Sequence, residues 1–172
     1  MDDSAPEITV TPIPDGPRRR IQASTQLLHD WITLAHPNAW VKYEMRLGPT
    51  PLSIPGYPVT PQTEAMLRRA NMYADAVIIE PGAVTVVEAA VVGYPGKISQ
   101  LRAYAALIMN TPELAPYIAR QLIEMHLWAV DSEIAHQMAV AHGQQVTIYT
   151  PPWIENYLSE KYWRRGSALP PA

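Results

Sequence analysis

The sequence predicts a single α/β domain built around a central β-hairpin, and three observations lead to that fold class. Two apolar, strand-like runs at 73–79 and 84–91 are joined through Pro81 and Gly82, which suit a tight turn. Apolar residues recur at helical spacing on either side of this hairpin. Helices then alternate with later strand-like runs, which is typical of parallel strand pairing.

The first expected elements are a helix over 21–35, where apolar residues form a broad stripe, and a strand over 40–47. The segment "HPN" separates them. Strict alternation in "WVKYEMRL" puts Val41, Tyr43, Met45 and Leu47 on one face of that strand, and the even-numbered residues, Glu44 among them, on the other.

A proline-rich loop at 48–61 and a short helix at 62–70 are expected before the hairpin. Beyond the hairpin, helix and strand alternate. The expected elements are a helix at 97–109, a strand at 121–130, a helix from about Ser132 to His142, a strand at 144–150 and a last helix at 151–165.

The chain divides into three regions. Prolines make residues 1–20 an extended arm, 21–165 form the domain, and 166–172 are a short tail. Aromatic residues of the last helix and the proline-rich arm are the expected contacts for protein partners or for a second copy of the chain.

Composition sets bounds on the function. The 172 residues carry a net charge of −3, so there is no bulk electrostatic attraction to nucleic acid, although a local basic patch is compatible with this charge. The absence of cysteine excludes disulfides and thiolate metal sites. The acidic, polar start does not resemble a signal peptide, and no apolar run approaches a membrane span. We therefore expect a cytoplasmic protein, with incorporation into a virion as an alternative.

Two acidic residues stand inside the otherwise apolar hairpin. If Pro81 and Gly82 form a two-residue turn, Asp75 and Glu88 lie opposite each other on the same face. Opposed like charges repel, and burying them is costly unless a cation lies between them. Mg²⁺ or Mn²⁺, which prefer oxygen ligands, would be such a cation, held by both carboxylates. Alternatively, both acids face water at an edge, or a bulge separates them.

Asp75 at the start of one strand, Glu88 in the next, and "QLRAY", Gln100 to Tyr104, in the following helix resemble motifs of the PD-(D/E)XK nuclease superfamily. Glu44 is similar to an upstream acid of that family. The resemblance spans about 21–149 and implies a restriction-endonuclease-like mixed sheet with flanking helices, in the core order α-β-β-β-α-β. It also implies a DNA substrate and a magnesium or manganese cofactor.

The family pattern requires a lysine at position 90, where this chain has Ala90. In the family, that lysine helps to activate the attacking water or to stabilise the charged transition state, a role that alanine lacks. Three explanations are open. The chain has kept the fold and lost the chemistry, Lys97 in the next helix has taken over the role, or the sequence carries a deliberate inactivating change.

Two functional classes follow. One is a binding or structural component of a nucleoprotein or viral (phage) assembly that reuses a nuclease fold. The other is a magnesium-dependent DNA endonuclease or exonuclease, with Glu44, Asp75, Glu88, Lys97 and Gln100 as the catalytic residues. Arg68, Arg69 and Tyr104 are candidate nucleic-acid contacts, although a solvated helix face or a helix–sheet boundary also explains such residues. The five histidines show no metal-ligand spacing.

Overall fold

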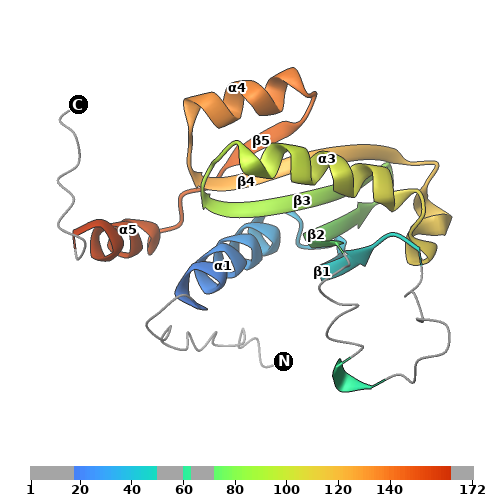
Figure 1. Cartoon of the computed structure of the whole chain (residues 1–172), viewed down its shortest axis with the longest axis horizontal. Coiled ribbons are helices and arrows are strands. Elements are labelled where there is room, and N and C mark those ends of the chain that lie inside the picture. The colour runs from blue at the N-terminus through green and yellow to red at the C-terminus, as the bar shows by residue number, and fades with distance from the viewer. Residues whose placement is uncertain (1–17, 50–59, 63–71, 164–172) are drawn as a thin grey trace, which may run out of the picture.

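A five-stranded mixed sheet with helices on both faces forms the protein (Figure 1). The computed structural model describes residues 18–49, 60–62 and 72–163. The strands lie side by side in chain order: β1 (Trp40–Leu47), β2 (Met72–Glu80), β3 (Ala83–Val92), β4 (Gln121–Val130) and β5 (Gln145–Ile148). β1, β2 and β3 pair antiparallel, whereas β3, β4 and β5 pair parallel. The predicted mixed α/β class and the parallel pairing of the later strands are confirmed.

The helices form two layers (Figure 1). α1 (Arg18–Ala35) and α5 (Ile154–Trp163) pack on one face of the sheet, where their apolar side chains share a core cluster with Ala76, Ile78 and Leu127. α3 (Gly96–Ile108) and α4 (Glu133–Ala141) cover the opposite face. A 3₁₀ helix, η1 (Pro112–Tyr117), lies between α3 and β4, where no helix was predicted. The predicted core order α-β-β-β-α-β is therefore present.

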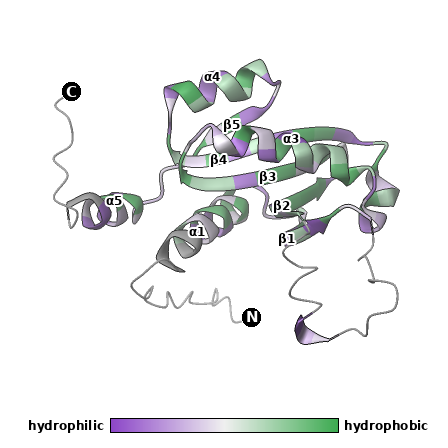
Figure 2. Cartoon of the chain, viewed as in Figure 1, coloured by the Kyte–Doolittle hydropathy of each residue, from purple (hydrophilic) through white to green (hydrophobic). Residues whose placement is uncertain are grey.

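The central strands are largely hydrophobic because helices cover both of their faces (Figure 2). Eight of the ten residues of β3 are buried, and they form a nearly continuous apolar run. The main exceptions are Thr85 and Glu88, which are buried polar residues. A carboxylate in such surroundings needs a partner, which makes the environment of Glu88 the starting point for the site.

The side-chain alternation of β1 changes phase at Glu44, contrary to the strict alternation predicted from sequence. Val41 and Tyr43 pack into the cluster on the α1 side, whereas Met45 and Leu47 pack into the cluster on the α3 side. Glu44 has a φ of 46°, in the left-handed region that non-glycine residues rarely adopt. This one backbone conformation turns the rest of the strand over.

The neighbouring strand changes phase at the same level. Ala76 packs on the α1 side and Ala74 on the α3 side, although strand residues two apart normally share a face. Asp75 lies between them, and the β1–β2 register skips the position of Glu44 and Asp75, between the pairs Tyr43↔Ala76 and Met45↔Ala74. Strained backbone concentrates at functional sites, and here it brings two acidic residues together.

The hairpin register follows the prediction for five residue pairs, from Glu80↔Ala83 to Ala76↔Val87. Pro81 and Gly82 therefore form the two-residue turn as expected. The ladder stops one pair before Asp75 and Glu88, so these two are not paired through their backbones as the prediction required. A side-chain contact takes over at that point.

Parts of the chain fall outside the described residues. These parts include most of the expected arm, most of the proline-rich loop, the short helix with Arg68 and Arg69, and the tail. α1 begins at Arg18, three residues before the predicted Ile21. Among the described helices, none combines the length and the apolar character that a membrane span needs.

Candidate active site

A cleft of about 480 Å³ lies at one end of the sheet. Its walls come from α1, α5, the first three strands and the start of α3. Its polar lining residues are Ser24, Thr25, Glu44, Asp75, Lys97 and Lys161. Two acids and two lysines thus converge from four separate elements, and apolar residues of β3 form part of the floor.

Asp75 lies where β2 and β3 stop pairing. Its Oδ2 accepts a hydrogen bond of 2.8 Å from the backbone N–H of Ala89, which replaces the next rung of the ladder. Burial raises the pKa of Asp75, and the negative charge of Glu44 raises it further. The Ala89 hydrogen bond and the Lys97 charge lower that pKa in part. Burial therefore disfavours the ionised form of this carboxyl group, in a place where a cation would stabilise it.

Glu88 and Lys97 form an ion pair inside the site. Glu88 is 1% exposed, and its Oε1 accepts a hydrogen bond from Nζ of Lys97, in the first turn of α3. Burial lowers the pKa of Lys97, while the charge of Asp75 raises it. Lys97 thus supplies one positive charge to the two acids.

One oxygen of Glu88 has no partner within the described part of the chain. Oε2 is buried and makes no hydrogen bond there. Buried polar atoms are nearly always satisfied by protein, water or an ion, so this oxygen marks a position for a further ligand. The site thus offers one bare carboxylate oxygen beside Lys97.

Gln100 and Tyr104 lie one turn apart on α3, as the sequence indicated. Nε2 of Gln100 donates a hydrogen bond to the hydroxyl oxygen of Tyr104. Tyr104 is 2% exposed, and burial raises its pKa, as does the nearby Asp75. Tyr104 therefore exposes almost no surface for the predicted contact with nucleic acid. The ring instead packs in the core below α3, and neither Gln100 nor Tyr104 lines the cleft.

Ala90 lies on β3 two residues beyond Glu88. It is 7% exposed, borders the cleft and packs in an apolar cluster with Ile98 and Trp128. The structure therefore places no charge at this position and brings the Lys97 amine to Glu88 instead. Relocation of the missing lysine to Lys97 stays a prediction, as do the other two explanations.

The expected aromatic contacts of the last helix are internal where they are described. Trp153 and Tyr157 pack against the α1-side core, and the indole N–H of Trp153 donates to Oδ2 of Asp30 at 2.7 Å. This bond joins the residue that precedes α5 to α1. The side chains of Tyr162 and Trp163 lie outside the described residues, so a partner contact there stays a prediction.

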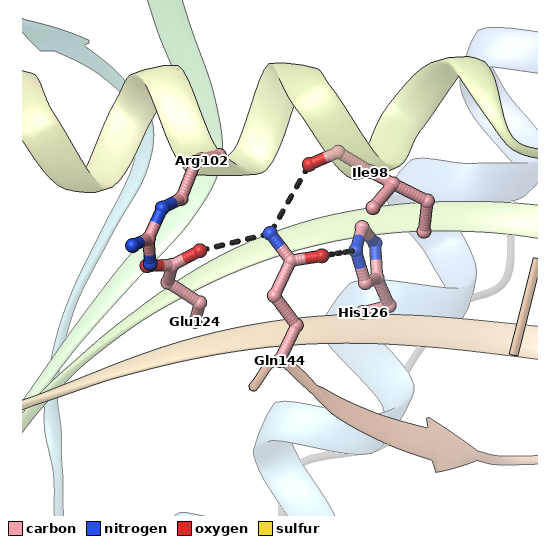
Figure 3. Close-up of polar contacts among 5 residues, drawn as sticks. All are labelled: Ile98, Arg102, Glu124, His126 and Gln144. Atoms are coloured by element: carbon pink, nitrogen blue, oxygen red, sulfur yellow. Dashed lines mark hydrogen bonds and ion pairs between the residues drawn. The ribbon is translucent and has the colours of Figure 1, made fainter. Parts of the chain in front are cut away.

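Sequence reasoning missed a buried polar network beside the site (Figure 3). His126 on β4 contacts Gln144, and Gln144 also contacts Glu124 and the backbone of α3. The available signal was the spacing of Glu124 and His126, which places two polar side chains on one face of an otherwise apolar strand. Because α3 covers this face of β4, the polar side chains there need hydrogen-bond partners within the protein.

The site's chemistry fits a hard divalent cation. Among residues 18–49, 60–62 and 72–163, no three His, Asp or Glu side chains gather closely enough to ligate a metal by themselves. Mg²⁺ does not require this, because it usually binds through one or two carboxylates together with waters and substrate phosphates. The carboxylates of Asp75 and Glu88 fit that description, and metal binding stays a prediction.

We expect Asp75→Asn to stabilise the metal-free protein at pH 7. The amide keeps an oxygen to accept the Ala89 hydrogen bond but removes a buried charge. Because burial raises the folded-state pKa of Asp75, the wild-type carboxyl group contributes stability only when protonated, and that contribution is lost as the pH rises through the raised pKa. The variant's higher melting temperature should therefore shrink as the pH falls toward 4.

The measurement is thermal unfolding in EDTA across this pH range, with Glu133→Gln on the exposed start of α4 as the control. A variant that melts below the wild type at pH 7 would contradict the expectation.

Comparison with known proteins finds two solved structures of limited similarity. No protein-family model matches the chain, and no curated protein matches it either. Among solved structures, a repair endonuclease from Pyrococcus abyssi is similar over 83% of this chain, with a TM-score of 0.45 and 11% identity. A protein of unknown function, AF1548, is similar over 80% of this chain, with a TM-score of 0.41 and 14% identity. The matches cover 50% and 66% of those two chains, respectively.

Proposed function

We propose that this protein is a divalent-metal-dependent nuclease that hydrolyses phosphodiester bonds in DNA, with Lys97 in the role of the lysine missing from position 90. The observation that carries the proposal is the contact between the Lys97 amine and the buried Glu88, next to Asp75. A structural ion pair alone would not account for the strained Glu44 and the raised pKa of Asp75 on the same cleft.

The residues divide the work as follows. Asp75 and Glu88 would hold Mg²⁺ or Mn²⁺, which supplies charge neutralisation for the phosphate and lowers the pKa of a bound water. Lys97 projects from α3 toward the same carboxylates, where its positive charge stabilises negative charge on the phosphate oxygens in the transition state. Glu44 lines the cleft from β1, and Gln100 donates a hydrogen bond to Tyr104. DNA is the substrate that the motif resemblance supports.

The test is cleavage of plasmid and linear DNA in Mg²⁺ and in Mn²⁺. We expect nicking or degradation by the wild type that EDTA abolishes. We expect Asp75→Ala to lose that activity, by about 100-fold or more, because it removes a metal ligand. Glu133→Gln, which changes an exposed carboxylate away from the cleft, should cleave as the wild type does. Metal-dependent cleavage that survives in Asp75→Ala would point to a contaminating nuclease and sink the assignment.

A second candidate is a non-catalytic binding or structural protein, for example in a nucleoprotein or viral assembly. The favouring observation is that Lys97 already neutralises Glu88 in a position that is nearly closed to solvent. Under this candidate, neither metal supports cleavage, and Ala90→Lys does not create it. Light scattering would then show whether the chain assembles with itself.

A further inference from the structure

Two buried polar atoms without partners lie on neighbouring residues of the sheet. They are Oε2 of Glu88 and Nδ1 of His126. Glu88 on β3 and His126 on β4 are register partners in a parallel ladder, so their side chains leave the sheet on the same face, below α3. His126 is fully buried. Buried polar atoms such as these two normally form a hydrogen bond with protein or with an ordered water.

The hydrogen bonds of Gln144 fix which nitrogen of His126 carries the proton (Figure 3). The Gln144 amide N–H₂ donates to the carbonyl oxygen of Ile98 at 3.1 Å and to Oε2 of Glu124 at 2.8 Å. The Ile98 carbonyl and the Glu124 carboxylate can only accept hydrogen bonds, so an amide flipped to point its oxygen at them is excluded. Its Oε1 must therefore accept from Nε2 of His126, at 3.0 Å.

With the proton on Nε2, the neutral ring presents Nδ1 as an acceptor. Burial lowers the pKa of His126, and the Lys97 charge lowers it as well, which favours this neutral form. Other charged groups around the ring are Glu124, which raises the pKa, and Arg102, which is paired with Glu124. Two acceptors, Nδ1 and Oε2, thus lie on adjacent strands and need a donor between them.

We propose that His126 is a positioning residue for Glu88, and that one water molecule donates hydrogen bonds to both His126 Nδ1 and Glu88 Oε2. The inference rests on the proposed function for its effect on metal binding; the water bridge rests on two buried, unpartnered atoms on paired strand residues and on the tautomer of His126. Carboxylates that ligate metals are commonly held by such outer hydrogen bonds. Through Gln144 and Glu124, the bridge ties Glu88 to α3 and to β4.

Two conservative substitutions separate this role from a purely structural one. Asparagine places a polar atom where His126 has Nδ1, whereas glutamine places one where it has Nε2. If His126 acts on Glu88, His126→Asn should keep Mn²⁺ affinity and cleavage within about threefold of the wild type, and His126→Gln should lose about 10- to 100-fold in both. The reverse order, or equal losses, would overturn the proposal. Mn²⁺ affinity is measured by electron paramagnetic resonance on the whole chain.

A second readout stays valid if the wild type neither binds Mn²⁺ nor cleaves DNA, which would defeat the proposed function alone. Nitrogen-15 NMR of labelled histidine should show the Nε2–H tautomer of His126 in the wild type. Glu88→Gln should shift the Nδ1 resonance of His126, and the exposed control Glu133→Gln should leave that resonance unchanged. An Nδ1–H tautomer, or an Nδ1 chemical shift that is the same in the wild type and in Glu88→Gln, would overturn the water bridge.

Discussion

Replacing Lys97 by alanine is expected to remove DNA cleavage, with a loss of about 100- to 1,000-fold or more. The reason is that Lys97 is the cation that contacts the buried Glu88, and no cation stands at Ala90 to replace it. Lys97→Arg should recover only part of the rate, because the planar guanidinium does not reproduce a compact ammonium. The rate is measured under single-turnover conditions in Mg²⁺. Lys42→Ala, on the exposed face of β1, is the matched control.

The same substitution should also lower stability, and a double variant separates the two effects. Lys97→Ala leaves Glu88 ionised and unpaired in the interior, which costs roughly 3 kcal/mol. Adding Glu88→Gln removes that charge, so the double variant should melt close to the wild type; it tests stability alone, because Glu88 is itself a proposed metal ligand. If Lys97→Ala, assayed below its melting temperature, still cleaves at the wild-type rate, Lys97 has no catalytic role.

Gly93→Ala is expected to destabilise the protein by roughly 3 kcal/mol. A Cβ at Gly93 would lie 2.6 Å from Cε3 of Trp128, and the Trp128 ring is fully buried between α3 and α4. The backbone has little freedom to move away, because the N–H of Gly93 donates to the carbonyl oxygen of Val130. Urea unfolding measures the change.

Gly82→Ala is the matched control for this overpacking. It adds the same methyl group at the hairpin turn, where no atom lies within 4 Å, and its effect should stay within about 0.5 kcal/mol. Equal unfolding midpoints for Gly93→Ala and the wild type would show that Trp128 can shift, and would contradict the rigid packing around it.

Local sequence chemistry was enough to predict the hairpin and the two acids within it. Pro81 and Gly82 specify a two-residue turn, and a turn of known length fixes the register of the strands that leave it. Lys97 was identifiable as a replacement cation because it stands in the first turn of the helix after β3. Helix and strand types followed from apolar periodicity, so the layer order was also accessible.

Two parts of the site were not accessible in this way. The phase change in β1 depends on one positive φ at Glu44, a conformation for which a glutamate gives no local signal. The His126 network depends on the register between β3 and β4, which are joined by a long crossover through α3 and η1. Such a register is set by packing across the whole domain and not by a short turn.

The strand order has a consequence for how the protein is made. Because the strands lie in the sheet in the order of synthesis, each can join its predecessor as it leaves the ribosome. Glu44, Asp75, Glu88 and Lys97 have all emerged by the time α3 is complete, whereas β4 and Gln144 arrive later. In the nascent chain, the acids and Lys97 therefore become available for contact before His126 and Gln144 do.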